Sequence, residues 1–482
     1  MDLPPPKALG SAGARPAAVV QPAETLEQAL YEVRKKIYPR AVHGWFAAWR
    51  WALVWATQLV FYGGAWLQWN DRQAVLFDIV HRKFYILGLV FWPQDIIYLT
   101  VLLIVSALGL FLFTAVAGRL WCGYACPQTV YTEIFMWVEE RIEGSRAARM
   151  KLDQSPLTAR KLGLKAAKHG AWLAIALWTG FTFVGYFTPI RELAAEVMTL
   201  TIGPWETFWC LFYGFATYGN AGWMREQVCK YMCPYARFQS AMFDRDTLVI
   251  TYDGGRGEPR GARSRAADRA ALGLGDCVDC GICVQVCPTG IDIRNGLQYE
   301  CIGCAACVDG CDQVMDKMGY PRGLIRYSTE NAVAQHLTRS QTLARVFRPR
   351  ALVYAGILAG IVIAAGVSLW LRVPLKVDVI RDRAAISREV EGGLIENVFR
   401  LQIMNTAETG RRFEVRAEGL PGIRVVSEPS VEVDAAASRM VPVRVRVPPG
   451  EARPGTHPIE FVVSAIGDEG VAVREKSVFI VR

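Results

Sequence analysis

Two runs of four cysteines are the part of this sequence that most directly indicates chemistry, because both are spaced C-x2-C-x2-C-x3-C. Three closely spaced thiolates can surround three corners of an iron–sulfur cube, and in two-cluster ferredoxins the fourth cysteine of each run serves the other cluster. The spacing predicts two [4Fe–4S] clusters, one held by Cys277, Cys280, Cys283 and Cys311 and one by Cys301, Cys304, Cys307 and Cys287. Zinc sites take four ligands, and disulfide frameworks belong to small secreted chains. We therefore expect an electron carrier.

A second motif, C-x-Y-x-C-P, occurs twice outside these runs and indicates an internal duplication. Repeats of this kind commonly share a site on their pseudo-twofold axis. The four thiols expected to converge there are Cys122, Cys126, Cys229 and Cys233. Soft thiolates could hold copper as Cu(I), hold another iron–sulfur cluster, or work as redox-active dithiols. The alternative is that they are ordinary buried thiols, as we expect for Cys210, which has no such partner.

The composition indicates a membrane protein. The chain has 482 residues, of which 52% are hydrophobic and 15 are Trp. The net charge of +9 lies largely in loops beside apolar segments. Membrane topology explains that placement better than nucleic-acid binding, so we expect contact with membrane lipid and none with nucleic acid.

Five segments have the length of about 20 residues that a membrane span requires. They are approximately Trp51–Trp69, Ile96–Val116, Ala171–Phe187, Trp205–Trp223 and Ala351–Leu371. Lys and Arg are concentrated before the first span and after the second and fourth, which places those sides in the cytoplasm. The N-terminus is then inside, the C-terminus is outside, and the cysteine runs lie in the reducing cytoplasm.

The last hundred or so residues have a different pattern. Short alternating apolar stretches are separated by turn residues such as those at 448–450, and no Cys occurs there. Six or seven strands of this kind predict an immunoglobulin-like sandwich that serves as an interaction module.

The chain is therefore expected to be a multi-domain protein, an α-helical transmembrane bundle with an inserted α+β ferredoxin domain and an all-β C-terminal sandwich. The predicted divisions are a disordered basic cytoplasmic N-terminus (1–44), a four-span membrane domain (45–245), a cytoplasmic two-cluster domain (246–340), a fifth span (350–372) and a periplasmic sandwich (376–482).

The sequence lacks the motifs of an embedded haem and of a nucleotide-binding site, which limits the possible electron donors. There are five His, none of them well inside a predicted span, which argues against an embedded b-type haem. No Gly-rich nucleotide fingerprint follows a strand and no P-loop occurs. Electrons must come from another protein or from quinol.

Three stretches resemble the signature segments of the CcoG family, also called FixG or RdxA. They are WCGYACPQTVYTEIF at 121–135, REQVCKYMCPYARFQ at 225–239 and RGEPRG at 256–261. The resemblance extends from about residue 40 to the end of the chain. It implies a polyferredoxin of the bacterial inner membrane that reduces Cu(II) to Cu(I) for assembly of cbb3-type cytochrome oxidase. The implied partners are copper-delivery proteins and oxidase assembly factors.

Two other functions remain open. One is a quinol-linked electron-transfer subunit that serves a periplasmic reductase. The other is a non-catalytic scaffold or redox sensor. The sequence names neither the electron donor nor the metal at the four paired thiols, and it leaves open a homodimer.

Overall fold

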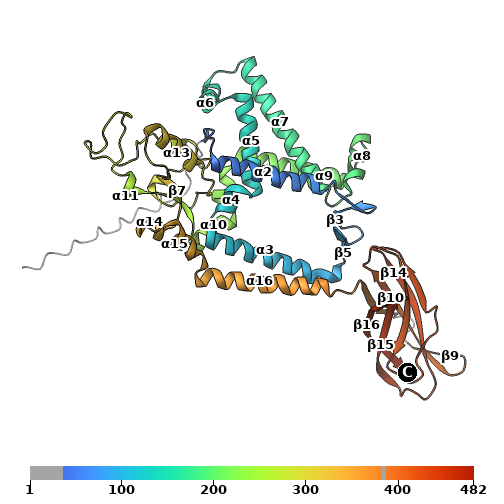
Figure 1. The fold of residues 1–482 in the computed structure, drawn as a ribbon. Coiled ribbons are helices and arrows are strands. Elements are labelled where there is room, and N and C mark those ends of the chain that lie inside the picture. The colour runs from blue at the N-terminus through green and yellow to red at the C-terminus, as the bar shows by residue number, and fades with distance from the viewer. Residues whose placement is uncertain (1–35, 383–386, 482) are drawn as a thin grey trace, which may run out of the picture.

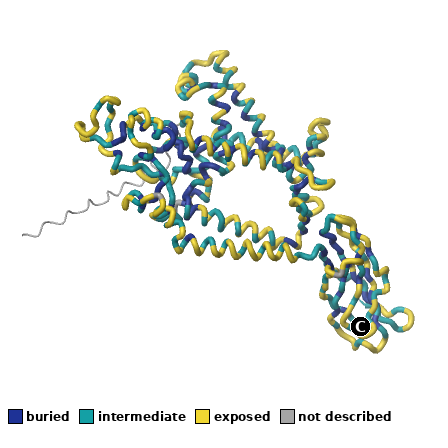
Figure 2. Tube along the Cα trace, in the orientation of Figure 1, coloured by how far each residue is buried: buried dark blue, intermediate teal, exposed yellow. Residues whose placement is uncertain are grey.

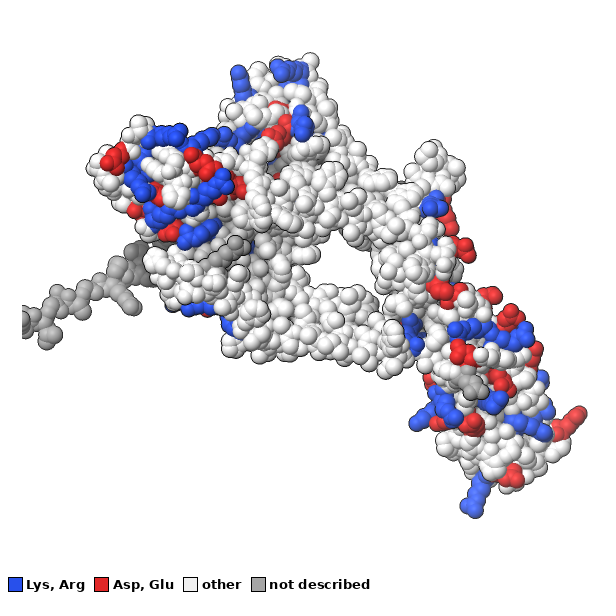
Figure 3. Space-filling view, viewed as in Figure 1, with Lys and Arg blue, Asp and Glu red and all other residues white. Residues whose placement is uncertain are grey.

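The computed structural model describes residues 36–382 and 387–481, so the prediction for residues 1–35 lies outside the described part. Two helical arms join a lobe rich in cysteine to a β-sandwich at the C-terminal end (Figure 1). Lys, Arg, Asp and Glu gather on the lobe, on the turn around α6 and on the sandwich, while the arms between them are almost free of charge (Figure 3).

One arm consists of two apolar helices that lie side by side, α3 (Ile96–Ala117) and α16 (Pro349–Trp370) (Figure 1). Pro349 is the first residue of α16, a position whose N–H has no partner within the helix, so proline is tolerated there. Within the described residues, Pro93–Ala117 and Pro349–Trp370 are the two helices long and apolar enough to cross a membrane. Their outer surfaces are largely exposed (Figure 2). Both coincide closely with predicted spans.

The other arm contains the remaining predicted spans. Its long helices are α2 (Trp45–Gly64), α5 (Pro127–Glu143), α7 (Ala159–Val184) and α9 (Pro204–Thr217). Glycines bring α7 and α9 close together, since a Cβ on Gly180 would lie 2.2 Å from the Cys210 carbonyl oxygen and 2.7 Å from the Gly214 nitrogen. Small residues allow this kind of close approach between helices in membranes.

The helix ends differ from the predicted spans in three places. Helix α7 begins twelve residues before the predicted start at Ala171 and ends at Val184, three residues before Phe187. Helix α2 begins six residues before the predicted start at Trp51 and ends at Gly64, so Trp69 lies in strand β1 (Gln68–Trp69). Helix α9 ends at Thr217, and π-helical turns follow at Tyr218–Met224 and Val228–Met232. The second of these turns contains Cys229. The five-span bundle as a whole stays a prediction.

The cysteine-rich lobe surrounds a small antiparallel pair, β6 (Val249–Tyr252) and β7 (Ile325–Ser328). Its helices are α11 (Gly254–Gly257), α12 (Ile282–Gln285), α13 (Ala306–Met318), α14 (Glu330–Ala334) and α15 (Arg339–Ala344). Cysteines and aliphatic side chains share its core, including Ile250, Val308 and Met315. Gly319, with a φ of +75°, ends α13 in the left-handed conformation that favours glycine.

The sandwich has two antiparallel sheets that enclose a continuous aliphatic and aromatic core. One sheet has the order β12-β14-β10-β8 with β9 on β10, and the other has the order β13-β11-β15-β16. The strands are β8 (Leu375–Arg381), β9 (Arg388–Val390), β10 (Leu394–Asn405), β11 (Arg411–Glu418), β12 (Arg424–Val425), β13 (Ser430–Val433), β14 (Ser438–Val447), β15 (Gly455–Ala465) and β16 (Asp468–Val481). The alternating stretches at 398–404, 412–416, 423–426, 440–447, 459–465 and 471–481 each coincide with a strand, whereas β8, β9 and β13 are not among them.

A small β-structure between α2 and α3 packs against the sandwich. The sequence did not indicate it. After β1 come β2 (Arg72–Gln73), β3 (Val75–Asp78), β4 (Lys83–Ile86) and β5 (Leu89–Phe91). Val90 and Trp92 pack on Met404 of the sandwich. Asp95, 4% exposed, lies 2.7 Å from Arg372 Nη2 and 2.5 Å from Lys376 Nζ, where α16 passes into β8. One buried carboxylate therefore fixes the linker to the sandwich.

We predict that Asp95→Asn loosens this linker. Removing the charge leaves two cations without their partner in a buried place, a change that typically costs about 3 kcal/mol. Limited proteolysis between α16 and β8 should be at least tenfold faster than in the wild type. The control is Glu418→Gln, whose exposed pair with Arg474 is worth less than about 1 kcal/mol. Equal cleavage of all three proteins would contradict this role for Asp95.

Candidate iron–sulfur and thiol site

The first predicted cluster has its four thiols around one cavity. Cys277, Cys280 and Cys283 come from the loop that leads into α12, and Cys311 comes from α13. Gly281, with a φ of +65°, gives that loop the left-handed turn it needs between the second and third thiol. Leu324 and Ile325 close the cavity, so sulfur and apolar side chains make its walls. This donor set suits an iron–sulfur cluster.

A second cavity brings together the other four thiols, Cys287, Cys301, Cys304 and Cys307. Cys283 also lines it, so the two cavities are neighbours. Burial raises the pKa of Cys301 to about 12, which keeps this thiol protonated until iron replaces the proton. The eight predicted ligands thus lie in two adjacent, largely apolar cavities that fit two clusters.

Polar groups that the sequence reasoning did not single out flank these thiols. The hydroxyl of Thr289 lies 3.3 Å from Cys287 Sγ. Arg294 lines the first cavity and is held by Asp292 at 2.7 Å. Hydrogen bonds to sulfur and nearby charge are two means by which proteins tune the potential of such clusters. In the sequence, the only indication of this role for Thr289 is its position directly after Cys287-Pro288.

The second cavity is in direct contact with the first C-x-Y-x-C-P motif, on the short helix α4 (Leu120–Tyr124). A Cβ on Gly123 would lie 2.8 Å from both the nitrogen and the Cα of Cys304. From the other side, Gly303 has a φ of +67° and faces the backbone of Arg119. The two loops can approach this closely only because each has a glycine at the contact.

The four thiols of the duplicated motif lie in the same region. Cys122 and Cys229 share one hydrophobic cluster with Cys304 and Cys307. Burial, together with the neighbouring Cys126 and Cys122, raises the pKa of Cys229 to about 12. Among the residues that the structure describes, no three His, Cys, Asp or Glu side chains are already placed to bind one metal ion.

Gln239 and Arg119 support this thiol region and were not foreseen as functional residues. Gln239 is fully buried on α10 (Pro234–Met242), and its Oε1 accepts hydrogen bonds from Arg119 Nε at 2.9 Å and Cys122 Sγ at 3.4 Å. Arg119 also donates to the Tyr299 carbonyl oxygen, which precedes Cys301 by two residues. Arg119 lies just before the stretch 121–135 and Gln239 ends the stretch 225–239, but only the fold brings the two side chains together.

Asp309 joins the lobe to α2. It lies on α13, and its carboxylate accepts the backbone N–H groups of Phe46 at 3.2 Å and Ala47 at 2.7 Å. The first turn of a helix leaves such N–H groups without partners, and a carboxylate there also interacts favourably with the helix dipole. The start of α2 is therefore set by a residue from the ferredoxin lobe.

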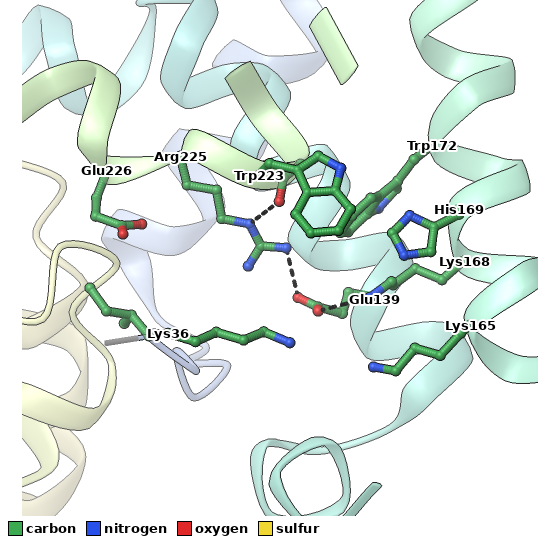
Figure 4. Close-up of a pocket in the computed structure, with 11 residues that line it drawn as sticks. Lys36, Glu139, Lys165, Lys168, His169, Trp172, Trp223, Arg225 and Glu226 are labelled. Carbon is green, nitrogen blue, oxygen red and sulfur yellow. Dashed lines mark hydrogen bonds and ion pairs between the residues drawn. The ribbon is translucent and has the colours of Figure 1, made fainter. Parts of the chain in front are cut away.

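A buried ion cluster joins α5, α6 (Arg146–Gln154), α7 and Arg225, which directly follows the first π-helical turn; Figure 4 shows Glu139, Lys168 and Arg225 of this cluster. Glu139 is 1% exposed and pairs with Arg225 at 3.0 Å, Arg149 at 3.2 Å and Lys168 at 3.6 Å. Burial alone would raise the pKa of Glu139, but these three cations outweigh it and lower that pKa. Arg225 is four residues before Cys229, so the ion cluster fixes the second motif to α5.

We predict that Gly123→Ala displaces the loop of the second cavity. Because a Cβ there falls within 3.0 Å of the Cys304 backbone, the loop must move. Iron content after anaerobic reconstitution should fall from about eight to about four per chain. Gly163→Ala on α7, where a Cβ would meet nothing within 4 Å, is the matched control. Full iron content in Gly123→Ala would overturn the contact.

We predict that Glu139→Gln lowers stability in a pH-dependent way. The pKa of Glu139 in the folded protein is below its ordinary value of 4.5, so its ion pairs stabilise the fold at neutral pH. That contribution is present above pH 4.5 and is lost as the pH falls through the folded pKa. The melting temperature of the variant should be several degrees lower between pH 6 and 8, and the difference should shrink in acid. A difference that does not vary with pH would count against the ion cluster.

Comparisons with known proteins agree with this architecture. A family model described as a 4Fe-4S dicluster domain matches residues 224–330, and one described as a 4Fe-4S binding domain matches residues 99–145. A model described as an IG-like fold at the C-terminal of FixG matches residues 365–482.

Similar proteins cover nearly the whole chain. Nitrogen fixation protein FixG of Rhizobium meliloti is 38% identical over 456 residues, which is 87% of this chain and 87% of that protein. Protein RdxA of Cereibacter sphaeroides is 39% identical over 88% of this chain and 92% of its own length, and protein RdxB of the same organism is 36% identical over 89% and 92%. With two cavities lined by cysteine, a C-terminal sandwich and this degree of identity, the chain belongs to the FixG/RdxA family of iron–sulfur electron-transfer proteins.

Proposed function

We propose that this protein transfers electrons through two [4Fe–4S] clusters to Cu(II), its substrate, and releases Cu(I) for assembly of a cbb3-type cytochrome oxidase. The observation that carries the proposal is the shared hydrophobic cluster of Cys122 and Cys229 with Cys304 and Cys307. Thiols able to bind a soft metal are thereby adjacent to thiols that suit an iron–sulfur cluster.

The chain's own residues supply a binding site that favours the reduced metal. When bound, the clusters supply single electrons. Reduction of Cu(II) to Cu(I) takes one electron and breaks no bond. Soft thiolates prefer Cu(I) to harder divalent ions. Binding at Cys122, Cys126, Cys229 and Cys233 therefore favours the product, and small movements of the π-helical turn that contains Cys229 would close four sulfurs around it.

We further propose that the protein is a multi-pass protein of the inner membrane, with the ferredoxin lobe in the cytoplasm and the sandwich in the periplasm. The support is the uncharged surface of both arms between two charged ends (Figure 3). Aromatic side chains such as Trp45, Trp205 and Trp370 are exposed at helix ends, as in an interfacial belt. The sandwich would then meet its partners on the periplasmic side, and copper-delivery proteins would meet the thiol site.

The function is tested by anaerobic single-turnover reduction of Cu(II). Clusters are reduced chemically, Cu(II) is added, and cluster oxidation is followed optically beside Cu(I) formation with a chelator. We predict that Cys122→Ser/Cys126→Ser and Cys229→Ser/Cys233→Ser each lower the rate at least tenfold and keep their iron. Cys210→Ser is the control, because Cys210 lies outside the duplicated motif and its backbone lies at the α7–α9 contact; this variant should react like the wild type.

Two outcomes would change the assignment. Loss of iron in the paired variants would make these thiols ligands of a further iron–sulfur cluster, which the match of residues 99–145 to a 4Fe-4S binding domain allows. Cluster oxidation by Cu(II) at the same rate in all variants would make copper incidental.

A further inference from the structure

A cavity of about 780 Å³ lies between α2, α5 and the ferredoxin lobe, away from the paired thiols. Its inner wall includes Val286 and Pro288, which flank Cys287, and Ala306, which precedes Cys307. This wall therefore touches the chain on both sides of Cys287 and directly before Cys307, two thiols of the second cavity. Small-molecule sites in proteins have volumes of roughly 300–1,000 Å³, so this cavity is large enough for an organic ligand.

The mouth of the cavity has the character of a membrane interface. Trp51, Trp55 and Trp137 line it, and the Trp55 and Trp137 side chains are 64% and 45% exposed. Trp51 and Trp137, from different helices, meet edge to face with their rings 6.3 Å apart. Indoles prefer the level of lipid headgroups, so a ligand that enters here comes from the bilayer.

The floor of the cavity has a buried cation with one donor that lacks a hydrogen-bond partner. Arg50 is 7% exposed, and its Nε has no hydrogen-bond partner. Its nearest carboxylate, Glu133, is 3.7 Å from Nη2, which is longer than a hydrogen bond. A buried donor without a partner is costly, and such groups in native proteins commonly meet a ligand or water. A ligand oxygen could accept from Nε while a ligand hydroxyl donates to Glu133.

Arg50 and Glu133 also connect this cavity to the redox-active thiols. Both line a second, smaller cavity together with Cys229 and Cys304. The same two side chains thus face the outer cavity on one side and both kinds of thiol on the other. A ligand bound at Arg50 would lie beside the second iron–sulfur site.

We propose that this cavity binds a membrane quinol and that the quinol is the electron donor of the protein. Four arginines line the cavity, Arg40, Arg50, Arg141 and Arg149, and so do two carboxylates, Glu133 and Glu140. A phospholipid headgroup would gain nothing from the carboxylates, whereas Arg50 and Glu133 together suit the oxygen and the hydroxyl of a neutral quinol. Oxidation of a quinol breaks two O–H bonds and releases two protons and two electrons. Each of the two clusters accepts one electron, one proton goes to Glu133 and the other to solvent.

This inference rests on the proposed electron transfer through iron–sulfur clusters but not on copper as the acceptor. The first test is binding by the full-length, cluster-free protein in lipid nanodiscs. An azido-quinone should label peptides of α2 or α5, and labelling should be competed by unlabelled ubiquinone. Trp137→Ala, a change at the exposed mouth, should lower labelling at least fivefold. Trp205→Ala, at an exposed indole on α9, is the matched control and should not.

The second test follows the transfer in reverse, from reduced clusters to a quinone. Clusters are reduced, excess reductant is removed, and a short-chain quinone is added in a stopped-flow instrument. The rate of cluster oxidation should saturate with quinone concentration in the wild type, and Glu133→Gln should lower the saturating rate at least tenfold. A similar rate of oxidation by ferricyanide in both proteins would show that the variant's clusters are intact.

Three results would overturn the proposal. One is labelling that is competed as well by phospholipid as by quinone, which would make the cavity a lipid site. Another is labelling elsewhere than α2 and α5. The third is a rate that rises linearly with quinone and is the same in Glu133→Gln. None of these results depends on copper, so they remain distinct from failure of cupric reduction.

Discussion

The structure depends on the contact between Gly123 and the backbone of Cys304. A glycine in the first C-x-Y-x-C-P motif allows helix α4 to touch the loop that supplies three thiols of the second cavity. Any side chain larger than hydrogen would separate them. Tyr327 secures the same place from the lobe, because its hydroxyl donates to the Gly303 carbonyl oxygen. The helical arms and the ferredoxin lobe are therefore joined at this contact, and the proposed redox reaction at the paired thiols would occur beside the iron–sulfur site.

Charge is arranged to hold that unit in place. Buried carboxylates stand where helices meet other parts of the chain: Glu139 ties α5 to α6, α7 and the second motif, Asp309 caps α2, and Asp95 fixes the linker of the sandwich. Each satisfies several donors, which is the condition under which a buried charge is tolerated. Between these anchors the arms have an uncharged surface and need few polar contacts of their own.

Much of the fold could be predicted from the sequence because its signals are local. The two C-x2-C-x2-C-x3-C runs indicate two [4Fe–4S] clusters, and long apolar runs indicate α3 and α16. Alternating apolar stretches separated by turn residues indicate the sandwich. Contacts between distant residues could not be predicted in the same way. Asp95 with Lys376, Cys122 with Gln239 and Arg50 with Glu133 join positions far apart in the chain, and no pattern along the sequence relates them. The β-structure before α3 was missed because its strands have only two to four residues.

The proposed donor and acceptor sites both adjoin the second cavity, and this arrangement would give electron flow a direction. Among the thiols of the first cavity Cys280 is exposed, whereas Cys304 of the second cavity is buried where Gly123 of α4 approaches it. A quinol from the bilayer would therefore reach the second cavity first, from the side of Cys287 and Cys307, and the paired thiols meet the same cavity at Cys304. The quinol and the copper ion would thus both exchange electrons with the cluster of the second cavity. The cluster of the first cavity would store the second electron of each quinol. A two-electron donor and a one-electron acceptor require such a store. This is a physical reason for the protein to hold two clusters, although a single cluster could carry electrons from the quinol site to the copper site.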